Sequence, residues 1–325
     1  MTVSLNRRQL LLTAAGISAA SLSLPPVQSL AANAETVVSG RLGWPHSMPF
    51  IADELGLWKK HGLDVAHRDL GNGSAAAEAI ASGSANYGYV GVPNAISLLK
   101  VGVPIKILSA TTIGGTTVYT FDKSINSVAH LRGKKVGIPR GVTTHALLFQ
   151  MYVAPKAGLD IKRDLTLIPL APTDNITAML RGDVDAAVSF DPYVSQALMH
   201  GARVLVPPEK MWDGPAFSAL VVGRSDFAAK DPGTLRKLLA VHAEAIAFTN
   251  QKPSEAAKIV NSLLRGTQKD YEILELSLKH LTFTTRLDPV MLDKFAKAMV
   301  DFGIIKSAPD LAKAVDTSFL PKDAM

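Results

Sequence analysis

The sequence predicts an α/β protein of two lobes, each an open and mainly parallel β-sheet with helices on both faces. Three observations predict this fold: a repeated unit of helix, glycine and strand, short apolar segments typical of buried strands, and a length of 325 residues. At about 150 residues per domain, this length corresponds to about two domains. Two chain crossings that act as a hinge are expected to join the sheets.

The repeat is a constant spacing between two parts of the chain. Residues 83–93 match residues 182–192, and Gly102 matches Gly201 at the same spacing of 99 residues. Each copy reads as a helix, a glycine, a short strand and a helix that starts at a proline. Proline is favourable there because its missing N–H would have no partner in the first turn. The ungapped spacing indicates two related halves rather than chance similarity.

The repeat also predicts the extent of the lobes. We expect residues 35–119 and 218–325 to form lobe one, with the second segment mostly helical, and residues 120–217 to form lobe two. The two crossings are expected near residues 119–121 and 217–222.

Residues 1–34 differ from the rest and predict an export signal. Arg7 and Arg8 precede an apolar run, Pro25 and Pro26 end it, and residues 32–34 offer a small-residue cleavage site. The paired arginines resemble a twin-arginine signal, and both that route and the general one stay open. The run is too short to span a bilayer. We expect a soluble protein in the periplasm.

Composition excludes several classes of protein. The chain has no cysteine, which excludes disulfides, thiolate metal sites and cysteine nucleophiles. The chain has 34 Lys and Arg against 28 Asp and Glu. The basic residues occur as short scattered pairs and form no patch suited to nucleic acid. The eight histidines lack zinc-binding spacing, and the G-x-G-x-x-A of residues 71–76 lacks the acidic partner of a dinucleotide site. We expect no catalytic residue, no metal and no cofactor.

A ligand site is predicted where helices follow the carboxyl ends of strands. Ligands bind there in open α/β sheets, because helix N-termini present unpaired N–H groups. The turns with Gly73 and Ser74 and with Gly141, Thr143 and Thr144 suit an anionic group. The alternative that Ser74 and Thr143 are only helix caps stays open.

Aromatic and charged residues complete this predicted site. Trp44, Phe190 and Tyr193 are expected to form apolar walls, and His46 and Arg140 to contact an anion.

Two further positions are equivalent in the repeat. Val92 and Asp191 directly precede Pro93 and Pro192, so each is expected to be the N-cap of its helix. Val92 has no side-chain oxygen, which leaves the N–H groups near Pro93 and Asn94 for a ligand anion. Asp191 is either a cap alone or a cap that also accepts from a ligand amine or hydroxyl in the cleft. The second hypothesis predicts a bifunctional ligand.

Four segments resemble one family: residues 53–65, 79–83, 131–136 and 182–193 look like motifs of the substrate-binding proteins of nitrate/sulfonate/taurine-type ABC transporters. The resemblance covers about residues 37–250. It implies a type II periplasmic binding protein fold that closes on a small molecule and docks on a permease in the inner membrane. We expect a monomer whose ligand is a small anionic or zwitterionic organic molecule. Val92 and Phe190 depart from the family's pattern at the cleft, so the resemblance does not imply the ligand's identity.

Two other functions share this scaffold. One is an enzyme similar to the thiamine-pyrimidine synthases of fungi, which carry a cysteine-rich motif and are cytosolic. The absence of cysteine and the export signal argue against it. The other is a sensor subunit, which the sequence does not separate from a transport receptor. We expect a solute receptor that is not an enzyme.

Overall fold

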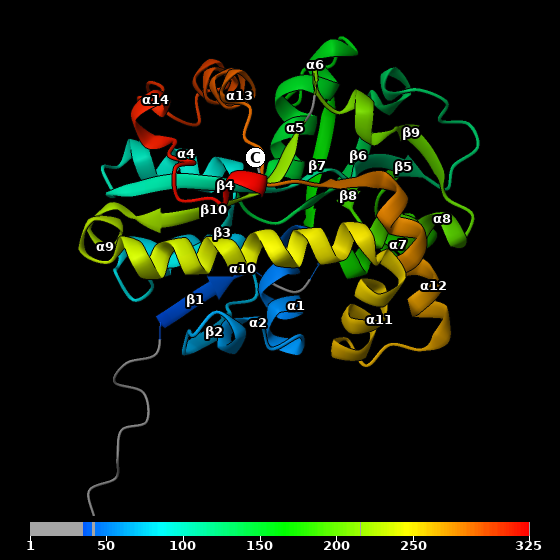
Figure 1. Cartoon of the computed structure of the whole chain (residues 1–325). Coiled ribbons are helices and arrows are strands. Elements are labelled where there is room, and N and C mark those ends of the chain that lie inside the picture. Colours follow the sequence, from blue (N-terminus) through cyan, green and yellow to red (C-terminus); the bar gives the residue numbers. More distant parts are fainter. Residues whose placement is uncertain (1–34, 41–42, 215, 325) are drawn as a thin grey trace, which may run out of the picture. The chain divides into compact units, whose positions relative to one another are not determined.

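The computed structural model describes residues 35–40, 43–214 and 216–324. These residues form two β-sheets with helices on both faces (Figure 1). The predicted export signal at residues 1–34 lies outside the described residues.

The first sheet, which defines lobe one, has the strand order β11-β4-β10-β3-β1-β2. In chain order its strands are β1 (Glu35–Ser39), β2 (Val65–Asp69), β3 (Tyr87–Gly91), β4 (Ile105–Gly114), β10 (Phe217–Arg224) and β11 (Leu281–Phe283). Its helices are α1 (Met48–Glu54), α2 (Leu57–Lys60), α3 (Gly73–Ala81), α4 (Val92–Lys100), α9 (Ser225–Lys230), α10 (Pro232–Gln251), α11 (Pro253–Leu263), α12 (Gln268–Ser277), α13 (Pro289–Asp301) and α14 (Leu311–Ala314).

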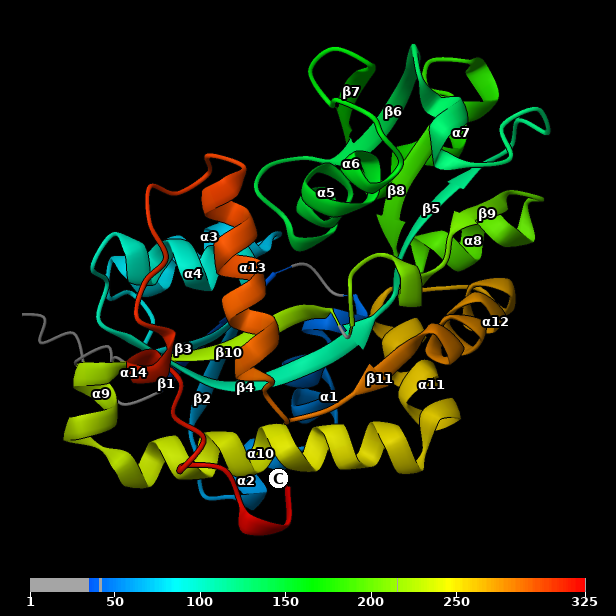
Figure 2. The same ribbon diagram turned by 90° about the horizontal axis from the view of Figure 1, so that it is seen from above.

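The second sheet, which defines lobe two, has the order β7-β6-β8-β5-β9. Its strands are β5 (Thr116–Thr120), β6 (Lys134–Pro139), β7 (Leu165–Leu170), β8 (Ala186–Phe190) and β9 (Arg203–Val206). Its helices are α5 (Thr144–Leu148), α6 (Ala154–Lys156), α7 (Asn175–Arg181) and α8 (Tyr193–Met199). Figure 2 shows these strands grouped together, on the side of the first sheet away from α10.

The two sheets are mixed: the strands that carry the chain between the lobes are antiparallel to their neighbours, and so is the edge strand β11 to β4. Strand β1 is parallel to β2 and β3, and β6 is parallel to β7 and β8, as predicted. Strands β10 and β5 are antiparallel to their neighbours. The reason is that each enters its sheet from the edge where the parallel strands end.

The first crossing corrects a predicted boundary. It lies at Gly114 and Gly115, between β4 and β5, and not near residues 119–121, because β5 pairs with β8 in the second sheet. Both glycines have a left-handed φ, 88° and 78°. A Cβ on Gly114 would lie 2.8 Å from the carbonyl oxygen of His280. Only glycine combines this φ with this close approach at no cost. The return crossing lies between β9 and β10.

Alternate residues of β3 pack into two different cores. Tyr87 and Tyr89 lie in a cluster with Leu235 and Leu239 of α10, which runs across the view in Figure 1. Val90 lies in the cluster of the opposite face, with α3, α4 and α13. This alternation is the period of a strand that is covered on both faces.

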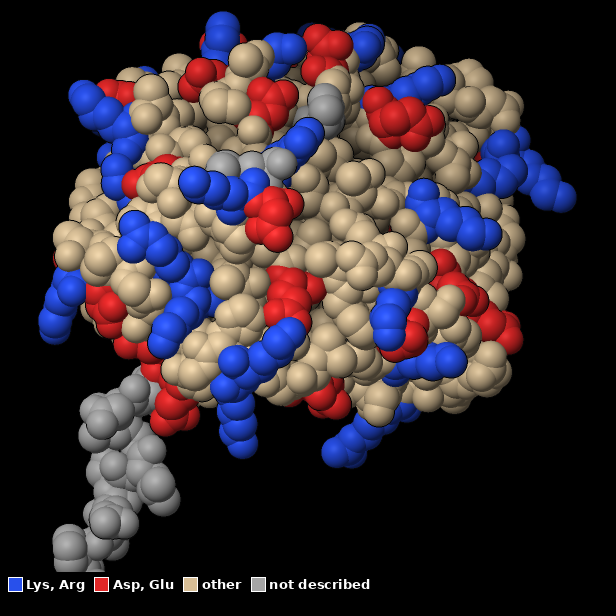
Figure 3. Space-filling model, viewed as in Figure 1, with Lys and Arg blue, Asp and Glu red and all other residues tan. Residues whose placement is uncertain are grey.

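The surface charge is mixed. On the face that Figure 3 shows, Lys and Arg side chains are interspersed with Asp and Glu side chains. None of the helices within the described ranges has the length and hydropathy that a membrane crossing requires.

Candidate functional site

A cavity of about 670 Å³ lies between the lobes, at the edge where the parallel strands of both sheets end. Its lining includes most of the predicted site residues: His46, Gly73, Ser74, Asn94, Arg140, Gly141, Thr143, Thr144, Phe190 and Tyr193. The turns after β2, β3, β6 and β8 therefore meet at one place, as the position of ligand sites in open α/β sheets predicts.

The lobe-one side of the cavity is built by the starts of α3 and α4. Asn72 is the N-cap of α3, because its side chain accepts from the N–H of Ala75 at 2.9 Å. Ser74 is therefore not a cap. Its hydroxyl instead accepts from the side-chain amide of Asn94 at 3.2 Å, which joins the two helix starts.

His46 reaches this side of the cavity from the turn after β1. Its Nδ1 accepts from the N–H of Gly40 at 3.4 Å, which leaves the proton of the neutral ring on Nε2. Burial lowers the pKa of His46 to about 4. At neutral pH this residue is thus an uncharged N–H donor.

The lobe-two side is built by the turn between β6 and α5. Thr143 is the N-cap of α5, since its hydroxyl accepts from the N–H of Ala146 at 3.2 Å. The buried hydroxyl of Thr144 bridges the lobes, because it accepts from the N–H of Val92 at 3.2 Å and donates to the carbonyl of Ser218 at 3.0 Å. The lobes are therefore in contact at the cavity in this structure.

One wall of the cavity is aromatic. The ring of Phe190 stacks on that of His145 with centroids 4.3 Å apart, and Tyr193 packs edge-on to Phe190 at 5.5 Å. His145 is held by Thr116, whose hydroxyl lies 2.6 Å from its Nδ1. Burial, and the nearby His46, lower the pKa of His145 to about 3. This wall is thus uncharged at neutral pH.

Three predicted residues in lobe one do not line the cavity. Trp44 is fully buried, with its indole N–H donating to the hydroxyl of Ser277 at 2.5 Å. The helix after β3 starts at Val92 and has Gly91 as its N-cap, so Val92 is not a cap. Val92 and Pro93 are buried in the core, and the N–H of Val92 is already paired with Thr144. This N–H is therefore not available to a ligand anion.

Asp191 stands one residue before the N-cap, which is Pro192, and it does not line the cavity, which contradicts both the predicted cap position and the second hypothesis for this residue. The helix begins at Tyr193, and Oδ1 of Asp191 accepts from the N–H and the hydroxyl of Ser195 at 3.1 and 2.7 Å. Its other oxygen, Oδ2, lies 3.0 Å from Nδ1 of His280. Asp191 is 1% exposed. A contact within the protein therefore replaces the predicted ligand contact.

Several lining residues were not among the individually predicted site residues. Some adjoin predicted ones in the same turns, and Glu78 follows Ser74 by one helical turn, a spacing that places both on one face of α3. The segment after β7 had no motif to identify it. These residues are Gly43, Pro45, Gly71, Asn72, Ala75, Glu78, Gly91, Val142, His145, Leu170, Ala171, Pro172, Thr173 and Ser218.

Comparison with known proteins identifies relatives along most of the chain. A Brucella abortus protein named for a binding role is 29% identical over 276 residues, 82% of this chain and 85% of the relative. The taurine-binding periplasmic protein of Escherichia coli is 30% identical over 181 residues, 55% of each chain. The crystal structure of the periplasmic aliphatic sulphonate binding protein of Escherichia coli matches with a TM-score of 0.73 at 20% identity, over 87% of this chain and 92% of that one.

These findings confirm the predicted two-lobed α/β fold and the predicted resemblance to binding proteins of ABC transporters. The sequence pattern of one family matches residues 35–264, which are more than half of the chain. The protein belongs to the NMT1-like family.

Proposed function

We propose that this protein is an exported solute receptor. It captures a small anionic or zwitterionic organic molecule in the cavity between its lobes and delivers it to the permease of an ABC importer. The observation that carries the proposal is this cavity, which both lobes line with helix starts and uncharged hydrogen-bond donors. Two relatives support the proposal, because one is named as a taurine-binding protein and the other as an aliphatic sulphonate binding protein.

The cavity suits an anionic group for a physical reason. Helices α3 and α4, each of 9 residues, begin at its wall, and the N-terminus of a helix carries a partial positive charge. His46 adds an N–H donor that stays neutral at pH 7, and Thr143 adds a hydroxyl. Phe190 and Tyr193 offer an apolar surface to the rest of the molecule.

Binding is proposed to close the lobes. Two crossings join them, and the groups that would contact a ligand are divided between both sides of the cavity. Only the closed arrangement makes all these contacts, so a ligand shifts the population toward it. We propose that the mature protein works in the periplasm as a monomer, without a cofactor and without a chemical step.

A thermal-shift screen tests the proposal. The mature protein is heated with sulfonates, taurine, nitrate, carboxylates and thiamine precursors. A ligand at a hundredfold excess over its dissociation constant adds about 2.7 kcal/mol, which corresponds to a rise in Tm of roughly 5 °C at this chain length. If no compound in the screen raises the Tm, the proposal is contradicted.

A matched pair of variants locates the binding. In Ser74→Trp the indole occupies the cavity, so the shift should disappear. Ser82→Trp changes an exposed residue at the other end of the same helix and should keep it. Loss of the shift in both variants would contradict binding in this cavity.

A further inference from the structure

Two charged side chains line the cavity, one from each lobe. Glu78 of α3 is the one carboxylate and Arg140 the one basic side chain apart from histidines among the lining residues in the described ranges. His46 and His145 add no charge at pH 7, because burial lowers their pKa values to about 4 and about 3. The cavity therefore presents one negative and one positive group on facing walls.

Glu78 lies on the face of α3 that borders the cavity. Ser74, one helical turn earlier, also lines it and holds Asn94 of the neighbouring helix start. Among the residues that the structure describes, ion pairs join many of the acidic side chains, but none involves Glu78. Glu78 is exposed at the cavity, and its carboxylate forms no ion pair with a cation of the described residues.

Arg140 stands on the opposite wall, directly after β6. Its Nε donates to the carbonyl of Pro169 at 3.4 Å, which orients the side chain along the edge of β7. No ion pair in the described part of the chain uses its guanidinium. The planar guanidinium can hold a carboxylate or sulfonate through two parallel hydrogen bonds, a geometry that lysine does not offer.

We propose that Glu78 is a specificity-determining residue, which selects among anionic ligands those that also carry a cationic nitrogen, while Arg140 contacts the anionic group. This inference rests on the proposed function and names the class of its ligand, an amphoteric molecule with an apolar part. The aromatic wall of Phe190 and Tyr193 would contact that part.

Coulomb's law gives the physical reason. A ligand with only an anionic group brings a second negative charge toward Glu78, and the two repel each other. An ammonium group on the same ligand turns this repulsion into attraction. The effect grows as the lobes close, because exclusion of water lowers the effective dielectric constant between the charges.

Two probes that differ by one ammonium group test the inference by isothermal titration calorimetry. They are 4-(aminomethyl)benzenesulfonate and 4-methylbenzenesulfonate, which share the ring and the sulfonate. The wild-type protein should bind the amino compound about tenfold more tightly, the effect of one charge-assisted contact. Glu78→Gln should weaken the amino compound and not the methyl compound, so that the preference falls to about twofold or less.

Two further variants serve as controls. Glu54→Gln removes the same charge from an exposed position of α1 outside the cavity and should keep the tenfold preference. Arg140→Gln should weaken both probes alike, since both carry the sulfonate.

The other outcomes overturn the inference. If Glu78→Gln keeps the tenfold preference for the amino compound, the inference is wrong. It is also wrong if the variant loses affinity for both probes equally, which would mean that Glu78 acts on closure of the lobes. If neither probe binds the wild-type protein while another anion raises its Tm, the ligand class is wrong and the proposed function stands. If no compound binds at all, both fail.

Discussion

Nδ1 of His280 lies 3.0 Å from Oδ2 of Asp191, and this contact joins the C-terminal part of lobe one to the start of α8 in lobe two. The carbonyl of His280 accepts from the N–H of Gly115, so the pair stands at the first crossing between the lobes. Helix α12, just before His280, packs against α8. The two lobes are therefore held together near the hinge by a titratable pair.

The His280–Asp191 pair makes stability depend on pH. The hydrogen bond that His280 donates to the Asp191 carboxylate raises the pKa of His280; burial lowers this pKa, the charges of Asp191 and Glu209 raise it, and the charge of Lys279 lowers it. A raised folded-state pKa gives stability that is fully present below the unfolded value, about 6.5, and is lost as pH rises through the folded value.

His280→Gln tests this dependence, because glutamine keeps an N–H donor for Asp191 but cannot be charged. We expect urea denaturation to give the variant a free energy of unfolding about 1 kcal/mol lower than wild type at pH 6, with a smaller difference at pH 8.5. A difference that is the same at both pH values would show that the charge of His280 contributes nothing.

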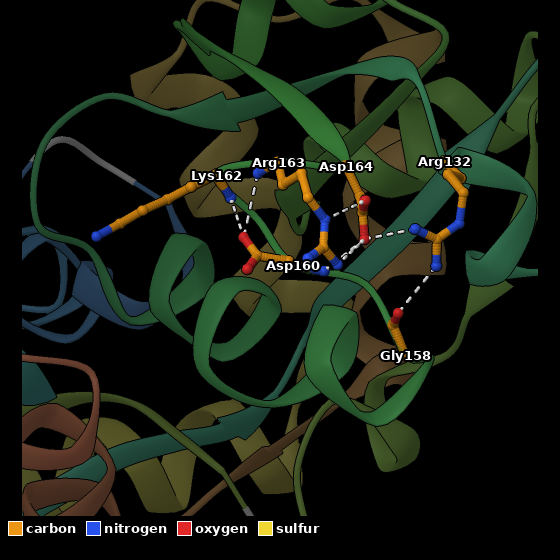
Figure 4. Close-up of polar contacts among 6 residues, drawn as sticks. All are labelled: Arg132, Gly158, Asp160, Lys162, Arg163 and Asp164. Carbon is orange, nitrogen blue, oxygen red and sulfur yellow. Dashed lines mark hydrogen bonds and ion pairs between the residues drawn. The ribbon is translucent and has the colours of Figure 1, made fainter.

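Asp164 should govern acid sensitivity in lobe two. Figure 4 shows its carboxylate beside two arginines. Arg163 Nε lies 3.2 Å from Oδ1, Arg132 Nη1 lies 2.6 Å from Oδ2, and the N–H of Asp160 donates to Oδ2 at 2.9 Å. The hydrogen bond from Arg163, then that from the Asp160 N–H and the Arg132 contact, lower the pKa of Asp164 to about 2.

The sign follows from this depressed pKa. The stability that the Asp164 carboxylate contributes is present above its unfolded-state pKa of about 3.9 and is lost as pH falls toward the folded-state pKa of about 2. Asp164→Asn should lower the Tm at pH 7, and its Tm should approach that of wild type at pH 3. Asp183→Asn, at an exposed aspartate outside the described ion pairs, should follow wild type throughout. A Tm deficit in Asp164→Asn that persists undiminished at pH 3 would contradict the role of its charge.

A side chain at the hinge glycine Gly114 should destabilise the fold. Gly114→Ala combines a left-handed φ with a Cβ 2.8 Å from a backbone oxygen, and should cost about 2 kcal/mol of unfolding free energy. Gly133→Ala has a similar φ of 76° but nothing within 4 Å of the added Cβ, so it should cost about 1 kcal/mol. Urea denaturation of both variants checks this order, and equal costs would refute the argument from close approach.

Closure predicts a change of size. Small-angle scattering with a ligand confirmed in the screen should give a smaller radius of gyration than the free protein, because binding draws the lobes together. An identical radius with and without saturating ligand would contradict a closing motion on binding.

Export predicts a new N-terminus. N-terminal sequencing of the protein from the periplasm should start near Glu35, after the small residues at positions 32–34. Periplasmic protein that still begins at Met1 would refute cleavage.

Local patterns were enough to predict the turns of the site. Gly73 and Thr143 lie in the turns after β2 and β6, Phe190 ends β8, and the topology of parallel strands brings such turns to one edge. The cap of α5 at Thr143 was likewise readable from its position before a helix.

The wrong assignments depended on partners far away in the chain. Trp44 is buried because Ser277 and Phe283 lie over it, and Asp191 is turned from the cavity by His280. Those partners belong to the C-terminal segment, whose packing no local pattern specifies. The first crossing was misplaced because the strand at Thr116–Thr120 has the same apolar character in either sheet, and only its pairing with β8 assigns it.

The most direct test of ligand capture between the lobes is a crystal structure of the protein with a compound that raises its Tm. The account predicts electron density for the compound in the cavity, in contact with Ser74 or Asn94 of lobe one and with Arg140 or Thr143 of lobe two. Density that contacts one lobe alone, or that lies in the separate groove lined by His61, Glu244 and Arg286, would contradict it.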